Sequence, residues 1–344
     1  MRIFGEELFL RQTNQENSFQ FTNFPTITSD LTSGNFFDHS KKTIYKAFVT
    51  FESGGTYSRF STFTNSANIV NTQIDPYIFS GNVKKMTTLK NKDITVHGDN
   101  YKSDLLCFIT DQNNVFTAYD IYSPGLYTTS SITIPTGTTL YDIDTNNEYT
   151  YVVGSNGFIS YSTDNGSTFN NINIASGIGD ISDLDFTCIA ASPKVFSAQI
   201  TALACAKYQG LAQIGIISKD TLIGVVPLVD TAGLVDIAYI NNNFVGISTS
   251  NFINFSTVIF DGTNFSNLNN ISLSSGDQIY QIKTVGNTLY CLKSNNEILK
   301  SSDGQVWQSE TFDLSQNTKI IGIEILDNLY CLITDNGFAL TKRI

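Results

Sequence analysis

The sequence predicts an all-β fold, a β-propeller of about seven four-stranded blades. Three observations predict it: a hairpin pattern that recurs along the chain, the lack of any helical stripe of apolar residues, and a composition that suits short strands and turns. The 344 residues include 25 Phe and 16 Tyr, and 41% of the residues are hydrophobic. This composition is enough for a core and argues against disorder.

The recurring pattern is an apolar strand, a short turn rich in Asn, and a second strand, which is the signature of a β-hairpin. Its clearest copies are Tyr151–Ser162, Tyr290–Ser301 and Tyr330–Thr341, and fainter copies are Leu106–Asp120, Ala204–Ser218 and Phe244–Phe260. Successive copies start 45, 53, 40, 46 and 40 residues apart. A period near 45 with several strands per repeat is typical of propellers.

Two further strands flank each hairpin. The strand ahead of it is predicted at Leu140–Ile143, Leu234–Ile240, Ile279–Val285 and Ile320–Leu326. The strand behind it is predicted at Phe169–Ile174, Phe265–Leu273 and Val306–Phe312. Four strands per repeat are what one blade requires.

A specific motif fills the turn between the third and fourth strands. Ser162, Asp164, Gly166 and Phe169 follow the pattern S-x-D-x-G-x-T-[WF]. A shorter version contains Ser301, Asp303, Gly304 and Trp307, the second half of that version recurs as Asp261, Gly262 and Phe265, and Thr50–Tyr57 has Glu in place of Asp. An Asp carboxylate can accept N–H bonds within such a turn, Gly supplies a positive φ, and the aromatic residue packs between sheets.

On these motifs the chain resembles the BNR/Asp-box β-propellers, a superfamily that includes sialidases, photosystem assembly factors, sortilin-like receptors and many phage and bacterial surface proteins. The resemblance covers about residues 45 to 344 and implies a fold. Asp-boxes in that superfamily are structural turns, so the resemblance implies a structural role for the motif residues and no catalytic one.

Residues 1–45 are expected to supply a closing strand and an attachment segment, with the propeller in residues 46–344. The last repeat offers strands at Ile320–Leu326, Leu329–Thr334 and Phe338–Lys342 and then ends, which leaves an unpaired edge. We therefore predict that an N-terminal segment pairs antiparallel with Phe338–Lys342 and closes the ring. Phe19–Phe24 is the preferred candidate and Ile3–Leu10 the other.

Enzymatic chemistry finds little support in the sequence. A sialidase needs three arginines from different blades, and the four arginines here are Arg2, Arg11, Arg59 and Arg343. Asp142, Asp144 and Asp236 are predicted on innermost strands and are the carboxylates that a hydrolase could use. Such residues also bind backbone amides, so we assign no catalytic residue and expect a protein that is not an enzyme.

No metal or cofactor site is expected either. The five cysteines lack CxxC spacing and are predicted to be buried apolar residues: Cys107, Cys188, Cys205, Cys291 and Cys331. The two histidines, His39 and His97, are expected in loops. The segment 144–148 is compatible with a cation-binding loop and equally with an Asn-rich hairpin turn.

The formal charge of −11 argues against nucleic acid and anionic membranes as partners. The N-terminus lacks an apolar signal segment, and the longest apolar stretch is interrupted by polar residues, so we expect no membrane insertion. The expectation is a soluble protein made in a cytoplasm, with possible incorporation in a virion.

These observations favour a non-catalytic interaction scaffold, most specifically a structural component of a multi-subunit particle such as a bacteriophage tail or baseplate. Its partners would be other protein subunits. One alternative is a propeller that binds a cell-surface glycan or a receptor. The other is a glycoside hydrolase or lyase that uses the channel carboxylates.

Overall fold

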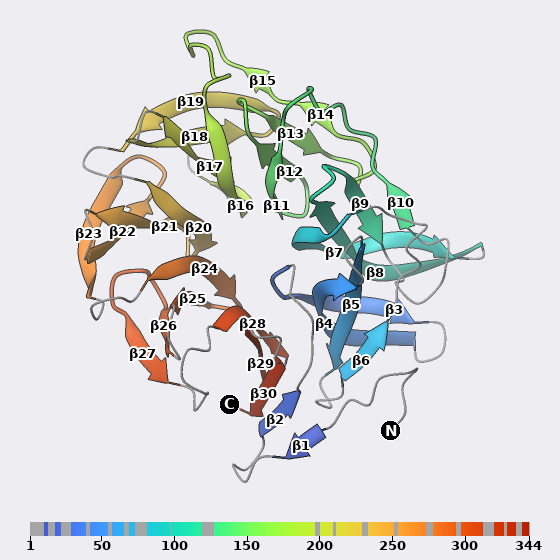
Figure 1. Cartoon of the computed structure of the whole chain (residues 1–344). Helices are drawn as coiled ribbons and strands as arrows, with labels where there is room; N and C mark the ends of the chain where they lie inside the picture. The colour runs from blue at the N-terminus through green and yellow to red at the C-terminus, as the bar shows by residue number, and fades with distance from the viewer. Residues whose placement is uncertain are drawn as a thin grey trace. The chain divides into compact units, whose positions relative to one another are not determined.

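The computed structural model (Figure 1) describes residues 10–12, 18–21, 29–38, 42–53, 57–64, 69–72, 81–96, 98–118, 127–196, 200–208, 211–228, 233–250, 254–272, 278–293, 297–311, 320–326, 329–334 and 339–343. Every regular element among these residues is a β-strand. The all-β prediction is confirmed, and the fold is a β-propeller. The chain divides into two compact units, unit 1 (Met1–Ser130 with Thr318–Ile344) and unit 2 (Ser131–Asn317).

Unit 2 contains four sheets, made almost entirely of antiparallel neighbours in chain order. The first two sheets consist of β11 (Leu140–Thr145), β12 (Thr150–Gly154), β13 (Ile159–Ser162) and β14 (Asn170–Asn171), and of β16 (Asp185–Phe196), β17 (Ile200–Tyr208), β18 (Leu211–Ser218), β19 (Thr221–Pro227) and β15 (Asn173–Ile174). The other two consist of β20 (Leu234–Ile240), β21 (Asn243–Ser250), β22 (Asn254–Phe260) and β23 (Phe265–Ser272), and of β24 (Ile279–Val285), β25 (Thr288–Lys293), β26 (Glu297–Ser301) and β27 (Gln308–Thr311).

Unit 1 contains three sheets. Two of them consist of β3 (Thr32–Asp38), β4 (Lys42–Ser53), β5 (Tyr57–Thr64) and β6 (Ile69–Thr72), and of β7 (Val83–Val96), β8 (Asp99–Thr110), β9 (Val115–Ala118) and β10 (Tyr127–Thr129). The third consists of β28 (Ile320–Leu326), β29 (Leu329–Thr334), β30 (Ala339–Arg343), β2 (Ser18–Phe21) and β1 (Leu10–Gln12).

The expectation of about seven four-stranded blades needs correction. In the described part of the chain five sheets have four strands, and the two others have five. One extra strand arises where the predicted strand Phe169–Ile174 divides in two. Its residues 170–171 pair with β13, whereas residues 173–174 pair in parallel with β19 of the next sheet.

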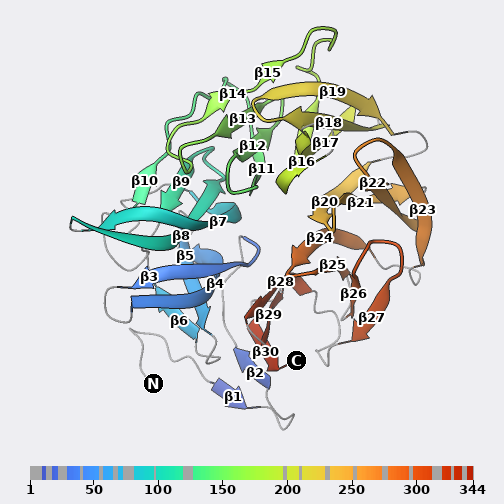
Figure 2. The ribbon, with the colours of Figure 1, turned by 180° about the vertical axis from the view of Figure 1, so that it is seen from behind.

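The third sheet of unit 1 joins the two ends of the chain. β2 pairs antiparallel with β30, with Phe19 opposite Thr341 and Phe21 opposite Ala339, and β1 then pairs with β2. Seen from behind, β2 and β1 continue the sheet of β28–β30 (Figure 2). The segment that pairs with the last repeat, Ser18–Phe21, therefore overlaps Phe19–Phe24, the preferred of the two N-terminal candidates. The other candidate, Ile3–Leu10, lies almost wholly outside the described residues.

The expected boundary between residues 45 and 46 falls inside β4. β3, which precedes that boundary, pairs along its whole length with β4 and so belongs to the same sheet. The Glu-containing motif at Thr50–Tyr57 lies partly outside the described residues. Within the described residues no helix is long and apolar enough to cross a membrane.

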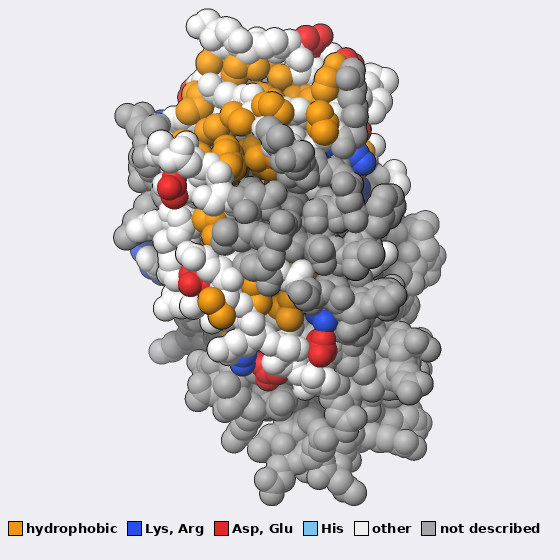
Figure 3. Space-filling view, turned by 90° about the vertical axis from the view of Figure 1, so that its left-hand side faces the viewer, with side chains coloured by type: hydrophobic (Ala, Val, Ile, Leu, Met, Phe, Trp, Pro, Cys, Tyr) orange, Lys and Arg blue, Asp and Glu red, His pale blue; other side chains and the backbone are white. Residues whose placement is uncertain are grey.

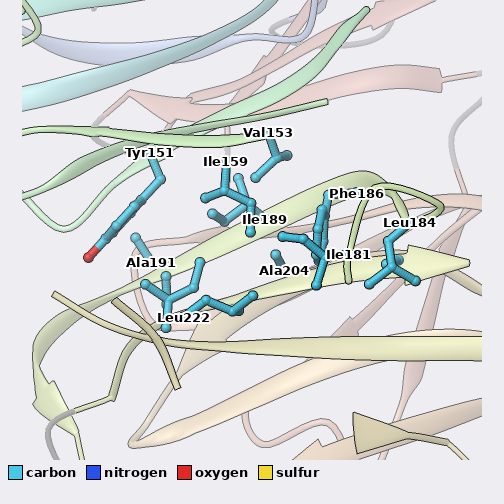
Figure 4. Packing of buried hydrophobic residues seen from close by; sticks show 13 residues of the cluster. Tyr151, Val153, Ile159, Ile181, Leu184, Phe186, Ile189, Ala191, Ala204 and Leu222 are labelled. Atoms are coloured by element: carbon cyan, nitrogen blue, oxygen red, sulfur yellow. The ribbon is translucent and has the colours of Figure 1, made fainter. Parts of the chain in front are cut away.

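Apolar side chains pack between neighbouring sheets. The cluster between the first and second sheets of unit 2 (Figure 4) draws Tyr151, Val153 and Ile159 from one sheet and Phe186, Ile189 and Leu222 from the other. All five cysteines are free and buried, as predicted. Each lies in a β-strand, where the small thiol side chain packs as an apolar residue.

Candidate functional site

A β-bulge recurs near the start of the first strand of six sheets. The register with the second strand shifts by one residue between the partners Val83/Lys85, Leu140/Asp142, Phe186/Cys188, Leu234/Asp236, Ile279/Gln281 and Ile320/Gly322. A bulge re-aims side chains and is frequent beside functional sites. We refer to the residue just after each shift, such as Asp142 or Asp236, as the post-bulge residue.

A short sequence repeat accompanies the bulges, and our sequence analysis missed it. It is an apolar residue, two variable residues and then Ile or Met: Val83–Met86, Leu140–Ile143, Phe186–Ile189, Leu234–Ile237, Ile279–Ile282 and Ile320–Ile323. These tetrapeptides start 57, 46, 48, 45 and 41 residues apart, close to the hairpin period. The post-bulge residue is the third in each, so the repeat would have placed Asp142 and Asp236 at equivalent positions.

Asp142 links two neighbouring sheets of unit 2. Its Oδ1 accepts a hydrogen bond from the N–H of Ile143, the next residue, at 2.9 Å. Its Oδ2 accepts one from the N–H of Ile189, on the first strand of the next sheet, at 3.0 Å. The residue is only 6% exposed, so these two bonds satisfy buried amides that would otherwise lack a partner.

Asp236 repeats this arrangement one pair of sheets further on. Its Oδ1 accepts from the N–H of Ile237 at 2.9 Å, and its Oδ2 accepts from Ile282 of the following sheet at 3.3 Å. The residue is 8% exposed. The four N–H groups at equivalent positions of unit 2 are thus served by two carboxylates, which explains why the intervening post-bulge residues, Cys188 and Gln281, need no charge.

Asp144, the third predicted carboxylate, is also engaged with the next sheet. Its Oδ2 accepts from the N–H of Ala191 at 2.9 Å. The following loop is a hairpin turn in which Asn146 Oδ1 accepts from the N–H groups of Glu148 and Tyr149 at 3.0 and 2.7 Å. Of the two interpretations of this segment, the structure favours the Asn-rich turn, because Asp144 Oδ2 and Asn146 Oδ1 accept from backbone amides.

Unit 1 uses carboxylates in a related way. Asp104 accepts 2.6 Å bonds from Asn91 within its own sheet and from Asn35 on β3 of a neighbouring one. Gly34 lies so close that a Cβ there would meet Asp104 Oδ2 at 2.5 Å. Asp30 and Glu324 each accept a hydrogen bond from the N–H of the next residue, Leu31 and Ile325, as Asp142 does from Ile143.

The chemistry open to these carboxylates follows from their partners. A general acid, base or nucleophile must direct an oxygen at a substrate, and hydrolases place two such groups opposite one another. Asp142 and Asp236 instead direct both oxygens at backbone amides of adjacent sheets. This geometry suits a structural role, in which each carboxylate joins the first strand of its own sheet to the first strand of the next. Among the described residues no group of three His, Cys, Asp or Glu side chains is arranged to hold a metal ion.

The predicted turn at residues 162–169 has a closed set of hydrogen bonds. Asp164 Oδ1 accepts from the Ser162 hydroxyl at 2.7 Å and from the N–H of Thr168 at 2.8 Å, and Ser162 Oγ accepts from Gly166 at 3.0 Å. Burial raises the pKa of Asp164, but the bonds from Thr168 and Ser162 outweigh it and leave this pKa below its ordinary value. Gly166 has a φ of 82°, and Phe169 is buried.

The turn at residues 301–307 repeats the pattern in its shorter form. Asp303 Oδ1 accepts from the N–H groups of Gln305 and Val306 at 2.8 and 3.3 Å, and Ser301 Oγ accepts from Gly304 at 2.9 Å. Trp307 donates its indole N–H to the Gly304 carbonyl at 3.1 Å and packs against the apolar cluster between the last two sheets of unit 2. The predicted turn chemistry is therefore present in both copies.

The partial copy at Asp261 keeps half of this network. Asp261 Oδ1 accepts from the N–H groups of Thr263 and Asn264, both at 2.9 Å, and Gly262 has a φ of 97°. Phe265 stacks on Phe260 with ring centroids 4.5 Å apart. Ile259 stands where the other two turns have serine, so the hydroxyl half of the network is missing, and the N–H bonds match those of Asp303.

Hydrophobic side chains also reach the surface. Figure 3 shows a group of them toward the upper end of one face. Ile174, Leu211 and Ile223, which all belong to the sheet of β15–β19, are 50%, 51% and 41% exposed. His39 and His97, the two predicted loop histidines, lie outside the described residues.

The fold class is supported by comparison with known proteins. Residues 237–343 match the family model of the DUF6242 β-propeller domain. This match covers less than half of the chain. The matched residues form the sheets of β20–β23 and β24–β27 and the strands β28–β30. No curated protein matches the chain.

Solved propellers match almost the whole chain at low identity. They include YCF48 bound to D1 peptide (10% identity, TM-score 0.58, 99% of this chain and 100% of that one). A catalytically inactive virginiamycin B lyase from Staphylococcus aureus with quinupristin matches at 12% identity and a TM-score of 0.61, over 98% of this chain and 99% of that one. BamB from Moraxella catarrhalis matches at 12% identity and a TM-score of 0.50, over 93% of this chain and 86% of that one. Likeness at these identities shows the fold alone.

Proposed function

We propose that this chain is a non-catalytic interaction scaffold that serves as a structural subunit of a multi-subunit particle, such as a bacteriophage tail or baseplate. The observation that carries this proposal is the use of the first-strand carboxylates. Asp142 and Asp236 hold adjacent sheets together, and the sequence offers no other evident acid–base pair. Protein subunits of the same particle are the partners that the proposal implies.

The propeller neighbours are compatible with this role. YCF48 is a propeller that binds a peptide, and BamB shares the fold. A lyase shares it too, which keeps lyase or hydrolase chemistry as the rival function. What speaks for the scaffold over the rival is that a lyase or hydrolase would need to free at least one of the carboxylates from its backbone amides.

The finer features of the fold belong to the same proposal. We assign the turns at Ser162 and Ser301 to the Asp-box type, with a role in stability. We also propose that the pairing of β2 with β30 is the closing contact of the propeller. Closure by a strand from the opposite end of the chain removes the open edge of the last sheet, which would otherwise invite aggregation.

Chemical cross-linking of native particles, followed by mass spectrometry, tests the proposal. We expect cross-links between lysines of this chain and those of other subunits, at the same positions in independent preparations. A glycan array and a turnover assay run on the purified chain address the rival functions. Reproducible glycan binding without any subunit cross-link, or turnover of any substrate, would overturn the scaffold role.

A further inference from the structure

Two tyrosines come together at one end of the first two sheets of unit 2. Tyr149 lies in the turn between β11 and β12, and Tyr161 lies on β13. Their ring centroids are 6.3 Å apart and their planes are tilted by 48°. Both rings are partly exposed, and each packs on its inner side against the cluster shown in Figure 4.

A third tyrosine fixes the position of this pair. Tyr151 stacks on Tyr149 with centroids 5.9 Å apart and an interplanar angle of 12°. Its buried hydroxyl is within 2.7 Å of the Thr201 hydroxyl and donates to the carbonyl of Lys219 at 2.8 Å. The aromatic group is therefore anchored to both sheets, which limits the entropy that a ligand would have to remove.

Carboxylates lie beside the tyrosines. Glu148 directly precedes Tyr149 in the turn, and Asp220 directly follows Lys219, whose carbonyl accepts a hydrogen bond from the Tyr151 hydroxyl. Burial raises the pKa of the Tyr149 hydroxyl, and the charges of Glu148 and Asp220 raise it further. Asp220 is held by Asn173 and Thr221, with Oδ2 to Asn173 Nδ2 at 3.2 Å and Oδ1 to the Thr221 hydroxyl at 3.1 Å. Glu148 is exposed and forms no ion pair with any residue that the structure describes.

We infer that Tyr149, Tyr161, Glu148 and Asp220 form a docking site for an arginine or lysine side chain from a protein partner. Tyrosine faces attract a cation within about 6 Å of the ring centroid. Carboxylates at the edge of the rings add complementary charge. The net charge of −11 on the chain favours the approach of a basic segment over an acidic one. This inference rests on the proposed function and names the chemistry of the partner.

Fluorescence anisotropy with labelled peptides tests the site. The probe is acetyl-Gly-Arg-Gly-Arg-Gly-amide, and its matched control has citrulline, which is neutral, in place of arginine. We expect the arginine peptide to bind and the citrulline peptide to bind at least tenfold more weakly. Tyr149→Leu should weaken the arginine peptide about two- to fivefold, the range expected for an exposed cation–π contact.

The remaining variants distinguish loss of the proposed site from a general change in surface charge or aromatic content. Glu148→Gln, an exposed change that leaves the core intact, should weaken binding about as much and lessen its salt dependence. Tyr149→Phe keeps the aromatic face and should bind as the parent does. Tyr208→Leu and Asp183→Asn, at exposed residues of unit 2 outside the site, should leave affinity unchanged.

Two results would overturn the inference. The first is equal binding of the arginine and citrulline peptides, and the second is unchanged affinity in both Tyr149→Leu and Glu148→Gln. Binding of a neutral oligosaccharide that is lost in Tyr149→Leu, without any peptide binding, would also contradict it and favour a glycan ligand. Failure here is distinguishable from failure of the scaffold role, because subunit cross-links in native particles do not depend on these peptides.

Discussion

Asp142 shows how a single side chain can join two sheets. Each of its oxygens satisfies one backbone N–H, on Ile143 and on Ile189, and both groups are removed from water. A buried donor without a partner costs about 1–3 kcal/mol. The bonds therefore contribute more to stability than their modest net strength suggests, because both N–H groups are buried.

The substitution Asp142→Ala should lower the free energy of unfolding by about 2–5 kcal/mol, since it leaves two buried N–H groups unpaired. Urea denaturation followed by circular dichroism measures the change. Asp183→Ala, at an exposed position of the same unit, is the matched control and should change stability by less than about 0.5 kcal/mol. Equal stability of the two variants would show that Asp142 does not hold the sheets together.

Asp303 makes stability depend on pH. Bonds from the N–H groups of Gln305 and Val306 and from the Ser301 hydroxyl hold its pKa below the ordinary value. A carboxyl whose folded pKa lies below its unfolded pKa, about 3.9, stabilises the fold above that pH. The contribution is lost as the pH falls through the folded pKa.

We therefore expect the stability difference between the parent and Asp303→Asn to be constant from about pH 5 to 7 and to shrink below about pH 4. The neutral amide of asparagine does not titrate, so the variant lacks this source of acid sensitivity. Urea denaturation at a series of pH values measures both proteins. A difference that stays the same down to pH 3 would contradict the role assigned to the charged turn.

At the scale of elements, the pairing of β2 with β30 has a direct consequence. Deletion of residues 1–25 removes β1 and β2 and leaves β30 as an open edge. We expect the truncated protein to aggregate or to melt several degrees lower, because unpaired strand edges recruit other chains. Thermal denaturation and light scattering measure the two effects.

Deletion of residues 1–9 is the matched control, since it shortens the chain but retains β1 and β2. That protein should melt as the parent does and remain monomeric. If both truncations behave alike, the N-terminal strands do not protect the last sheet. They would then be better explained as an attachment segment.

The elements also show what the sequence could and could not predict. Hairpins such as Tyr151–Ser162 were predictable because alternating apolar residues and Asn turns are local signals. The division of Phe169–Ile174 was not, because the parallel pairing of Ile174 with Leu222 depends on a strand nearly fifty residues away. The carboxylates were recognised as candidates, but their amide partners on the next sheet lie beyond any local pattern.

The bulges show a second limit of prediction from sequence, a pattern that is present but not recognisable by itself. Their tetrapeptide repeat is present in the sequence, yet two of its four positions vary, and an apolar residue three places before Ile is too common to notice without the register. Tyr149 and Tyr161 come together only when β13 pairs with β12. The segment of Asp220 reaches them only when the next sheet packs alongside, where the carbonyl of Lys219 accepts a hydrogen bond from the Tyr151 hydroxyl.

For the molecule as a whole, we expect no hydrolase or lyase activity. The first-strand carboxylates are engaged with backbone amides, and the arginines within the described residues, Arg11, Arg59 and Arg343, come from two sheets, whereas a sialidase needs arginines from three. A screen against sialosides, uronides and common bacterial exopolysaccharides measures turnover. Activity that Asp144→Asn or Asp236→Asn abolishes in folded protein would show that these residues are catalytic.

The central claim is that the chain works as a subunit of a larger particle. Density-gradient sedimentation of native material, with quantitative mass spectrometry of each fraction, tests it most directly. We expect the chain to sediment with a large assembly, at a fixed ratio to the other subunits across preparations. Recovery of the chain only in fractions of about its own mass, 37.9 kDa, would contradict the account.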